Sequence, residues 1–431
     1  MYLTVKQQVK HLSREDYLAL RELCRAAKNL TNQAIYEIRQ YYFKEEKYLR
    51  YEECYRILKH SPNYRKLNSN MAQQILKEVD GSFKSFFGLL RLADQGDYAY
   101  DRIRLPGYLP KDGYATLIIA MVRIDGNRLR IPYSNAFKKT HAPVEVTVPP
   151  VLKGRKIKEI RIIPKADAGY FELQYTYVAE KAVHCLDPQK AMALDLGVNN
   201  LVTAVTSEGR SLIIDGRRIK AVNQWYNKEN SRLQGIKDRQ DRKGGSDNSQ
   251  DRNEKQRKKL TRRQSRLLRK RNNAVNDYMS KTARRIVDTC ITQGIGQLVV
   301  GCNKGFQQES RMGKKGNQNF VQIPYGKLRS KLKYLCELNG IVYTEQEESY
   351  TSKASFWDRD EIPVYKDNKE EETTQFSGKR VRRGLYETAD GRKINADVNA
   401  ALNILRKSKV VSLTGLYHRG EVDTPERIRI A

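Results

Sequence analysis

Two short apolar runs that each break at an aspartate stand far apart in this chain. They read MALDLGVNNLVT at residues 192–203 and INADVNAALNI at residues 394–404. Mg²⁺ prefers oxygen ligands and often takes only one or two protein carboxylates beside a substrate phosphate. Asp195 and Asp397 are therefore the first candidates for a metal site, and a fold that uses them must bring two distant segments together. Asp-x-Gly after a strand is also a common turn, so one copy alone does not identify such a site.

The charge of the chain indicates a polyanionic partner. Its 431 residues carry a net charge of +31 with a pI near 9.8, which is typical of proteins that cover nucleic acid. An acidic membrane surface could attract the same charge, but apolar runs such as LIIAMV at 117–122 are too short to cross a bilayer. The opening MYLTVKQQVKHL lacks the pattern of a signal peptide, so we expect a cytoplasmic, nucleoid-associated bacterial protein.

Changes in pattern divide the chain into three parts. A capping pattern followed by apolar residues at helical spacing predicts helices over residues 13–95. Alternating apolar and polar residues predict a small β-barrel or sandwich over residues 96–185. Residues 1–12 are also strand-like and could pair with it, which would leave the helices as an insertion. Residues 186–431 read as α/β, so the expected fold class is multidomain α+β. Strands of this last part are expected near 190–205, 210–215, 297–301 and 341–346.

The most basic stretch of the chain is RNEKQRKKLTRRQSRLLRKR at 252–271. Such a run is usually a solvated helix face or a disordered tail, but Leu260, Leu267 and Leu268 give it a weak apolar stripe. We therefore expect a long helix that packs on the α/β domain and faces phosphates. The preceding residues 238–253 have the composition of a mobile linker. The candidate nucleic-acid contacts are Arg262, Arg263, Arg266, Arg269 and Lys270.

Three motifs resemble a known nuclease family. ALDLGVNNLVT, EESYTSKAS at 347–355 and DVNAALNI at 397–404, in this order, resemble the split RuvC-like nuclease domain of TnpB proteins from bacterial insertion sequences. These proteins are relatives of the compact type V CRISPR effectors. The resemblance extends to the opening helix and to LPGYLPKDG at 105–113, so it covers nearly the whole chain.

The resemblance implies both an architecture and an activity. Residues 1–12 and 96–185 would form a β-barrel wedge domain, residues 13–95 a helical recognition domain, and residues 186–431 an RNase H-like (RuvC) α/β nuclease domain. The implied partners are a guide RNA, from a transposon end or a CRISPR-like locus, and double-stranded target DNA, with one protein chain expected per guide. Base pairing would select the target, and the protein would read duplex shape and a short adjacent motif.

The second catalytic carboxylate of this family is missing from its usual place. The family has a glutamate at the end of the strand that here reads QLVVGCNKG, and this chain has Gly301 there. The next strand, GIVYTEQEES at 340–349, ends in Glu347 and Glu348. In an RNase H-like sheet these strands lie close together, so a glutamate from one can reach the position vacated by the other. We expect Glu348 as the second acid, with Glu347 as the alternative; a solvated acidic strand end would leave the site inactive.

The zinc ribbon of the family is also degenerate. Relatives carry two Cys-x-x-Cys pairs between the second and third motifs, whereas residues 353–393 contain no cysteine or histidine. The six cysteines of the chain are scattered, which suits a reducing compartment. We therefore expect no zinc, and a loop that is partly mobile or is held by Phe356, Trp357, Ile362 and Tyr365.

The implied chemistry is phosphodiester hydrolysis with two metal ions about 3.5–4 Å apart. Asp195 would bridge both ions, Glu348 would hold one and orient the water, and Asp397 would complete the other. Mg²⁺ is the expected ion, and Mn²⁺ could substitute. Asn199 and Asn399 are candidate outer-shell donors. A guided DNA-binding repressor with an inactive nuclease site and an accessory transposase remain the alternative functions.

Overall fold

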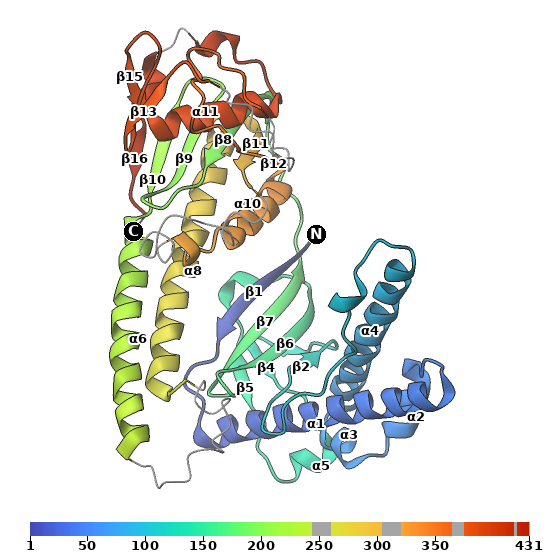
Figure 1. Ribbon diagram of the computed structural model, residues 1–431. Helices are drawn as coiled ribbons and strands as arrows, with labels where there is room; N and C mark the ends of the chain where they lie inside the picture. Colours follow the sequence, from blue (N-terminus) through green and yellow to red (C-terminus); the bar gives the residue numbers. More distant parts are fainter. Residues whose placement is uncertain (244–259, 304–319, 364–374, 418–419, 431) are drawn as a thin grey trace. The chain divides into compact units, whose positions relative to one another are not determined.

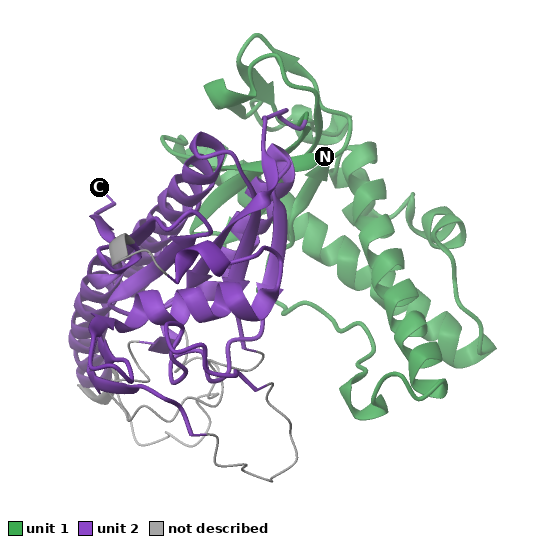
Figure 2. Cartoon of the chain, turned by 90° about the horizontal axis from the view of Figure 1, so that it is seen from above, with its two compact units in different colours: residues 1–180 green, residues 181–431 purple. Residues whose placement is uncertain are grey.

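The computed structural model describes residues 1–243, 260–303, 320–363, 375–417 and 420–430 (Figure 1). The chain forms two compact units, which Figure 2 colours separately. Unit 1 spans Met1–Glu180 and unit 2 spans Lys181–Ala431. The boundary between the units therefore precedes the boundary at 185 that the sequence pattern predicts. The division of unit 1 into a recognition domain and a wedge domain stays a prediction.

The helices of unit 1 follow the apolar spacing of the sequence. They are α1 (Arg14–Glu45), α2 (Tyr51–Leu58), α3 (Pro62–Lys66), α4 (Ser69–Asp94) and α5 (Asn135–Lys138), with 3-10 turns at Tyr100–Arg102 and Pro150–Leu152. The Ser13 side chain accepts a hydrogen bond from the Asp16 backbone N–H at 3.0 Å, which confirms the predicted start of α1. The apolar face of α1 is buried and contacts α4.

The strands of unit 1 form two separate sheets, with orders β1-β7-β6-β2 and β3-β4-β5. The strands are β1 (Tyr2–Gln8), β2 (Leu117–Ile119), β3 (Ile124–Asp125), β4 (Arg128–Arg130), β5 (Glu145–Thr147), β6 (Ile157–Lys165) and β7 (Tyr170–Val178). Tyr2 lies opposite Val178, so the first residues do pair with strands beyond the helices, as predicted. The expected barrel is not found: within residues 1–180, all described, β1 and β2 remain unpaired edges, and closure requires paired edges.

Unit 2 contains a six-stranded sheet in the order β12-β11-β8-β9-β10-β16. Its strands are β8 (Asp187–Asp195), β9 (Asn200–Thr206), β10 (Ser211–Asp215), β11 (Ile295–Gly301), β12 (Val342–Gln346) and β16 (Glu426–Ile428). Strand β9 runs antiparallel to both β8 and β10, whereas β11 runs parallel to β8, β12 parallel to β11, and β16 parallel to β10. A smaller sheet contains β13 (Lys379–Arg382), β14 (Leu385–Glu387) and β15 (Lys393–Asn395).

Helices cover both faces of the six-stranded sheet. They are α6 (Arg217–Lys243), α8 (Arg262–Thr292), α10 (Tyr325–Asn339) and α11 (Ala396–Ser408), followed by 3-10 turns at Thr414–Leu416 and Gly420–Asp423. Because strand side chains alternate, Ala191 and Ala193 of β8 pack with α11, while Met192 and Leu194 pack with α8 and α10. Figure 1 shows α11 lying across β8 and β9. The ends of β8 and β11 therefore share a face with α11.

The two long helices α6 and α8 pack side by side (Figure 1). Thr261 and Gln264 form a capping box that starts α8, so the basic stretch is helical from residue 262, as predicted. The predicted apolar stripe contributes less than expected, because Leu260 is exposed and Leu267 and Leu268 are half-buried.

The linker prediction is wrong in part. Residues 238–243 continue α6, because a polar sequence without glycine or proline can remain helical up to Gly244. The Gln234 side chain donates to the Asp238 carboxylate at 2.8 Å along this last part of the helix. Residues 244–253 of the predicted linker and 252–259 of the basic stretch lie outside the described residues.

Candidate functional site

Asp397 lies in the first turn of α11, where the helix dipole favours negative charge. The N-cap residue Asn395 accepts hydrogen bonds from the backbone N–H of Asp397 at 3.0 Å and of Val398 at 3.2 Å. The Asp397 carboxylate has two partners of its own. Asn200 donates to Oδ2 at 2.6 Å, and the Arg380 guanidinium lies 3.3 Å from Oδ1. The sequence analysis did not identify either partner.

Asp195 is the last residue of β8 and is partly buried on the α11 face. Loss of hydration raises its pKa well above the usual value of an aspartate. The carboxylates of Glu348 and Asp397 raise this pKa further, and Arg380 opposes them. These electrostatic contacts bring together the three acids that the sequence analysis selected.

Glu348 occupies the space that a side chain at position 301 would fill. A Cβ added to Gly301 would lie 2.6 Å from the Glu348 Oε2 atom. The ladder between β11 and β8 pairs Val300 with Leu194, so Gly301 comes next to Asp195 across the two strands. Burial, assisted by the charge of Glu347, raises the pKa of Glu348 to about 7, against the lowering effect of Arg329. A carboxylate from the end of β12 therefore stands at the end of β11.

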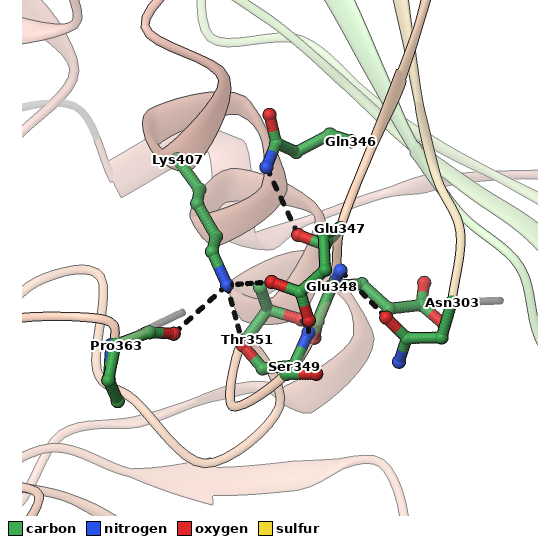
Figure 3. A network of polar contacts seen from close by, with 8 residues as sticks. All are labelled: Asn303, Gln346, Glu347, Glu348, Ser349, Thr351, Pro363 and Lys407. Carbon is green, nitrogen blue, oxygen red and sulfur yellow. Dashed lines mark hydrogen bonds and ion pairs between the residues drawn. The ribbon is translucent and has the colours of Figure 1, made fainter. Parts of the chain in front are cut away.

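Glu347 has a different set of partners from its neighbour. Figure 3 shows its carboxylate directed at Lys407 and at the backbone of Ser349, whose N–H donates to it at 2.6 Å. The Lys407 ammonium also donates to the Ser349 and Pro363 carbonyls, each at 3.1 Å. Burial alone would raise the pKa of Glu347, but Lys407 and Ser349 lower it below its usual value. Glu347 thus helps to fix the loop that follows β12, through Lys407 and the Ser349 backbone.

The loop after Glu348 is fixed to α11 by buried amides. Asn399 accepts from the Phe356 backbone N–H at 2.9 Å and donates to the Ala354 carbonyl at 2.8 Å. Asn403 donates to the carbonyls of Thr351 at 2.9 Å and Ala354 at 2.7 Å. These contacts link the two motifs: the asparagines of DVNAALN, on α11, anchor the backbone of the loop that carries YTSK.

The outer-shell roles predicted for two asparagines stay predictions. The Asn399 amide bonds to the backbone of the loop, as described above. The Asn199 side chain accepts from the Lys220 ammonium at 3.5 Å, and its carbonyl accepts from the Gly216 N–H at 2.7 Å. In this structure Asn200 is the asparagine that bonds to Asp397.

Comparisons with known proteins agree with these motifs. The family OrfB_IS605, described as a probable transposase, matches residues 174–307, and the Cas12f1-like TNB domain matches residues 325–404. TnpB-like protein ORF457 of Acidianus two-tailed virus is 26% identical over 420 residues, which cover 90% of this chain and 83% of that protein. The chain is thus similar to TnpB proteins and to compact type V effectors.

A solved structure shares the fold of this chain. In a Cas12f1–sgRNA–target DNA complex, the protein matches with a TM-score of 0.53 at 15% identity, over 91% of this chain and 83% of that one. A likeness at this identity concerns the fold alone. Across the described stretches of the chain, no helix combines the length and apolar character needed to span a membrane.

The three acids Asp195, Glu348 and Asp397 fit a hard cation by their chemistry. Their donors are all oxygens, and burial, together with neighbouring carboxylates, raises the pKa of both Asp195 and Glu348, so a divalent ion would favour their ionised forms. Among the residues that the structure describes, however, no group of three or more His, Cys, Asp or Glu side chains is spaced to hold an ion. Arg380 and Asn200 each contact one Asp397 oxygen, which leaves lone pairs of this carboxylate for an ion.

Strands β13 and β14 and the start of β15 belong to the part of residues 353–393 that the structure describes, where the resemblance implies a zinc ribbon. Phe356 is fully buried and stacks on Tyr417 with ring centroids 4.7 Å apart, and Trp357 packs beside it. Ile362 is half-buried, and Tyr365 lies outside the described residues. The predicted aromatic support is therefore present for Phe356 and Trp357.

Polar contacts that the sequence analysis missed also hold this segment. The Asp360 carboxylate accepts from the Ser355 backbone N–H at 2.7 Å and from the Ser377 N–H at 3.2 Å. The Arg406 guanidinium donates to the Asp360 carbonyl at 2.6 Å. Asp360 therefore joins residues that are distant in sequence.

The predicted nucleic-acid contacts lie on the first turns of α8. Arg262, Arg263, Arg266 and Lys270 are exposed, and Arg269 is half-buried. The next residue, Arg271, differs from these because its guanidinium donates to the side chain of Asn223 and to the carbonyl of Gln322, both at 2.8 Å. The start of α8 thus presents basic side chains to solvent, while Arg271 fixes the helix to its surroundings.

Proposed function

We propose that this chain is an RNA-guided DNA endonuclease whose nuclease site is formed by Asp195, Glu348 and Asp397. The observation that carries the proposal is the placement of Glu348. Its carboxylate stands beside Gly301, where the resembled family has its second acid, and it interacts with Asp195. The choice of Glu348 over Glu347 is supported by the separate commitment of Glu347 to Lys407.

The topology of unit 2 supports an RNase H-like interpretation. Three consecutive strands, β8, β9 and β10, are antiparallel, and β11 and β12 then add in parallel beside β8. In such a sheet the ends of β8 and β11 meet on the face that α11 covers. The related Cas12f1 was solved with an sgRNA and target DNA, which supports the same two partners here.

We expect Asp195, Glu348 and Asp397 to hold Mg²⁺, or Mn²⁺ in its place. Bound ions would stabilise the negative charge that develops on the transferring phosphate and the leaving oxygen. Glu348 must lose its proton before it can serve as a ligand or orient a water, because its pKa is about 7. The Arg380 guanidinium, 3.3 Å from the Asp397 carboxylate, would contact the phosphate in this proposal.

The exposed basic start of α8 supplies phosphate contacts in this proposal. Such contacts position the duplex and carry no sequence information. Target choice would come from base pairing to the guide and from a short adjacent motif. The net charge of +31 supports the same partners, since a polyanion releases counterions when basic side chains bind it.

The test is expression with the native flanking DNA, followed by sequencing of the RNA that co-purifies. A target matched to the guide part of this RNA is then assayed for binding and for Mg²⁺-dependent cleavage, with wild-type protein and Asp195→Ala. We expect both proteins to bind the target and only the wild type to cut it. Binding without cutting by the wild type would favour the repressor, an alternative that the lack of a ready ion group in the described residues also supports. Strand joining without a guide would favour the transposase.

A further inference from the structure

We propose that the end of β11 is a socket that positions Glu348, with Gly301 supplying its space and Asn303 holding its backbone. We call these two residues the β11 socket. Both act through Glu348, so both are positioning residues. The inference rests on the proposed nuclease site and adds to it the reason why an acid from another strand can serve there.

Glycine is required at position 301 because a side chain there would collide with its neighbours. Its φ lies outside the left-handed region, so the backbone itself would accept any residue. An added Cβ would instead lie 2.6 Å from Glu348 Oε2 and 2.6 Å from Ile404 Cδ1. The Leu194 carbonyl follows at 3.2 Å, so an alanine would displace the Glu348 carboxylate and also strain the contacts to Ile404 and β8.

Asn303 fixes where the Glu348 backbone stands. Its Oδ1 accepts a hydrogen bond from the Glu348 backbone N–H at 3.1 Å (Figure 3). Just before it, the Cys302 N–H donates to the Gln346 carbonyl at 2.8 Å and closes the ladder between β11 and β12. The preceding residue, Glu347, is tied to Lys407. Glu348 is thus anchored at its own backbone and through Glu347, and its carboxylate fills the space beside Gly301.

The register between β11 and β8 would allow the second carboxylate to be carried by residue 301 instead of Glu348. Residue 301 follows Val300, which pairs with Leu194, so a side chain at 301 extends on the same face as Asp195. The Glu348 oxygen lies within about two covalent bonds of the Cβ position at 301, given a carbon–carbon bond near 1.5 Å. A carboxylate carried by residue 301 can therefore reach the place that Glu348 fills, provided that Glu348 is shortened.

The first experiment moves the acid. Glu348→Ala should abolish cleavage of a guide-matched target and weaken Mn²⁺ binding, measured by electron paramagnetic resonance, by roughly tenfold or more. Adding Gly301→Glu, or Gly301→Asp for a shorter reach, to Glu348→Ala should restore both. Gly301→Ala and Asn303→Ala should each lower the cleavage rate by about a hundredfold through displacement of the carboxylate. Gly326→Ala is the matched control, because its added Cβ meets nothing within 4 Å.

The second experiment needs neither metal nor cleavage. Gly301→Ala should lower the melting temperature clearly in the wild-type background and less in the Glu348→Ala background, where the crowded carboxylate is absent. Equal losses in both backgrounds would overturn the socket, as would failure of both relocated acids to restore Mn²⁺ binding. A wild type that binds Mn²⁺ but never cuts would instead refute the proposed function and leave the socket standing, since the melting and Mn²⁺ measurements would still hold.

Discussion

Replacing Lys407 with methionine should destabilise unit 2, because it removes a buried cation. Methionine keeps the length of the lysine side chain, so the loss of the ammonium is the main change. The Lys407 side chain is 7% exposed, and its ammonium contacts the Glu347 carboxylate and two backbone carbonyls, those of Ser349 and Pro363. Methionine can make none of these hydrogen bonds. The variant therefore leaves one carboxylate and two carbonyls without this partner, next to the proposed second acid.

The size of the effect follows from the burial of the pair. Removing one partner of a fully buried ion pair costs about 3–5 kcal/mol, because the other charge stays buried. The Glu347 side chain is 34% exposed, so water can partly replace the lost ammonium, and we expect a cost of about 2–3 kcal/mol. For units of this size, about 2–4 °C are lost per kcal/mol, so the melting temperature should fall by about 4–12 °C.

Calorimetry of the full chain measures this loss. Lys281→Met is the matched control, because its pair with Asp277 joins side chains that are 50% and 60% exposed and should cost no more than about 0.5 kcal/mol. Adding Glu347→Gln to Lys407→Met should recover part of the stability, since it removes the uncompensated charge. A loss for Lys407→Met no larger than that of Lys281→Met would refute the reasoning.

Three further predictions concern nucleic acid and metal. The purified protein should carry RNA and bind nucleic acid with steep salt dependence, and RNA-free protein after expression with its native flanking DNA would contradict this. Exchanging Arg262, Arg263, Arg266 and Lys270 for glutamine should weaken binding about equally for all targets; a changed target preference at unchanged affinity would count against it. Mn²⁺ affinity should fall as the pH falls through about 7, because a raised pKa leaves Glu348 protonated below that value, and pH-independent binding would argue against Glu348 as a ligand.

Local patterns predicted the parts of the fold that depend on neighbouring residues. The capping pattern at Ser13 and the alternation in β7 both have their expected structures. The helical state of residues 238–243 could also have been read from the absence of glycine and proline before Gly244. Barrel closure was beyond such patterns, because it depends on whether two distant edge strands, β1 and β2, pair with each other.

In the candidate site, too, the sequence predicted some features and not others. The motifs identified the three acids, and their approach to each other depended on the sheet order that the resemblance implied. The partners of each acid depend on contacts between distant residues. Asn200 and Arg380 reach Asp397 from β9 and β13, and Lys407 engages Glu347 from the far end of α11. No spacing within one segment encodes such contacts.

Cleavage of a guide-matched DNA target by Glu347→Gln and Glu348→Gln, beside the wild type, tests the proposed site most directly. Glutamine preserves shape and removes the charge in both variants, and binding to the same target is measured in parallel. We expect Glu348→Gln to bind without cutting, and Glu347→Gln to keep most of the activity, because its amide oxygen can still accept from Lys407. A dead Glu347→Gln beside an active Glu348→Gln would contradict the assignment of the second acid.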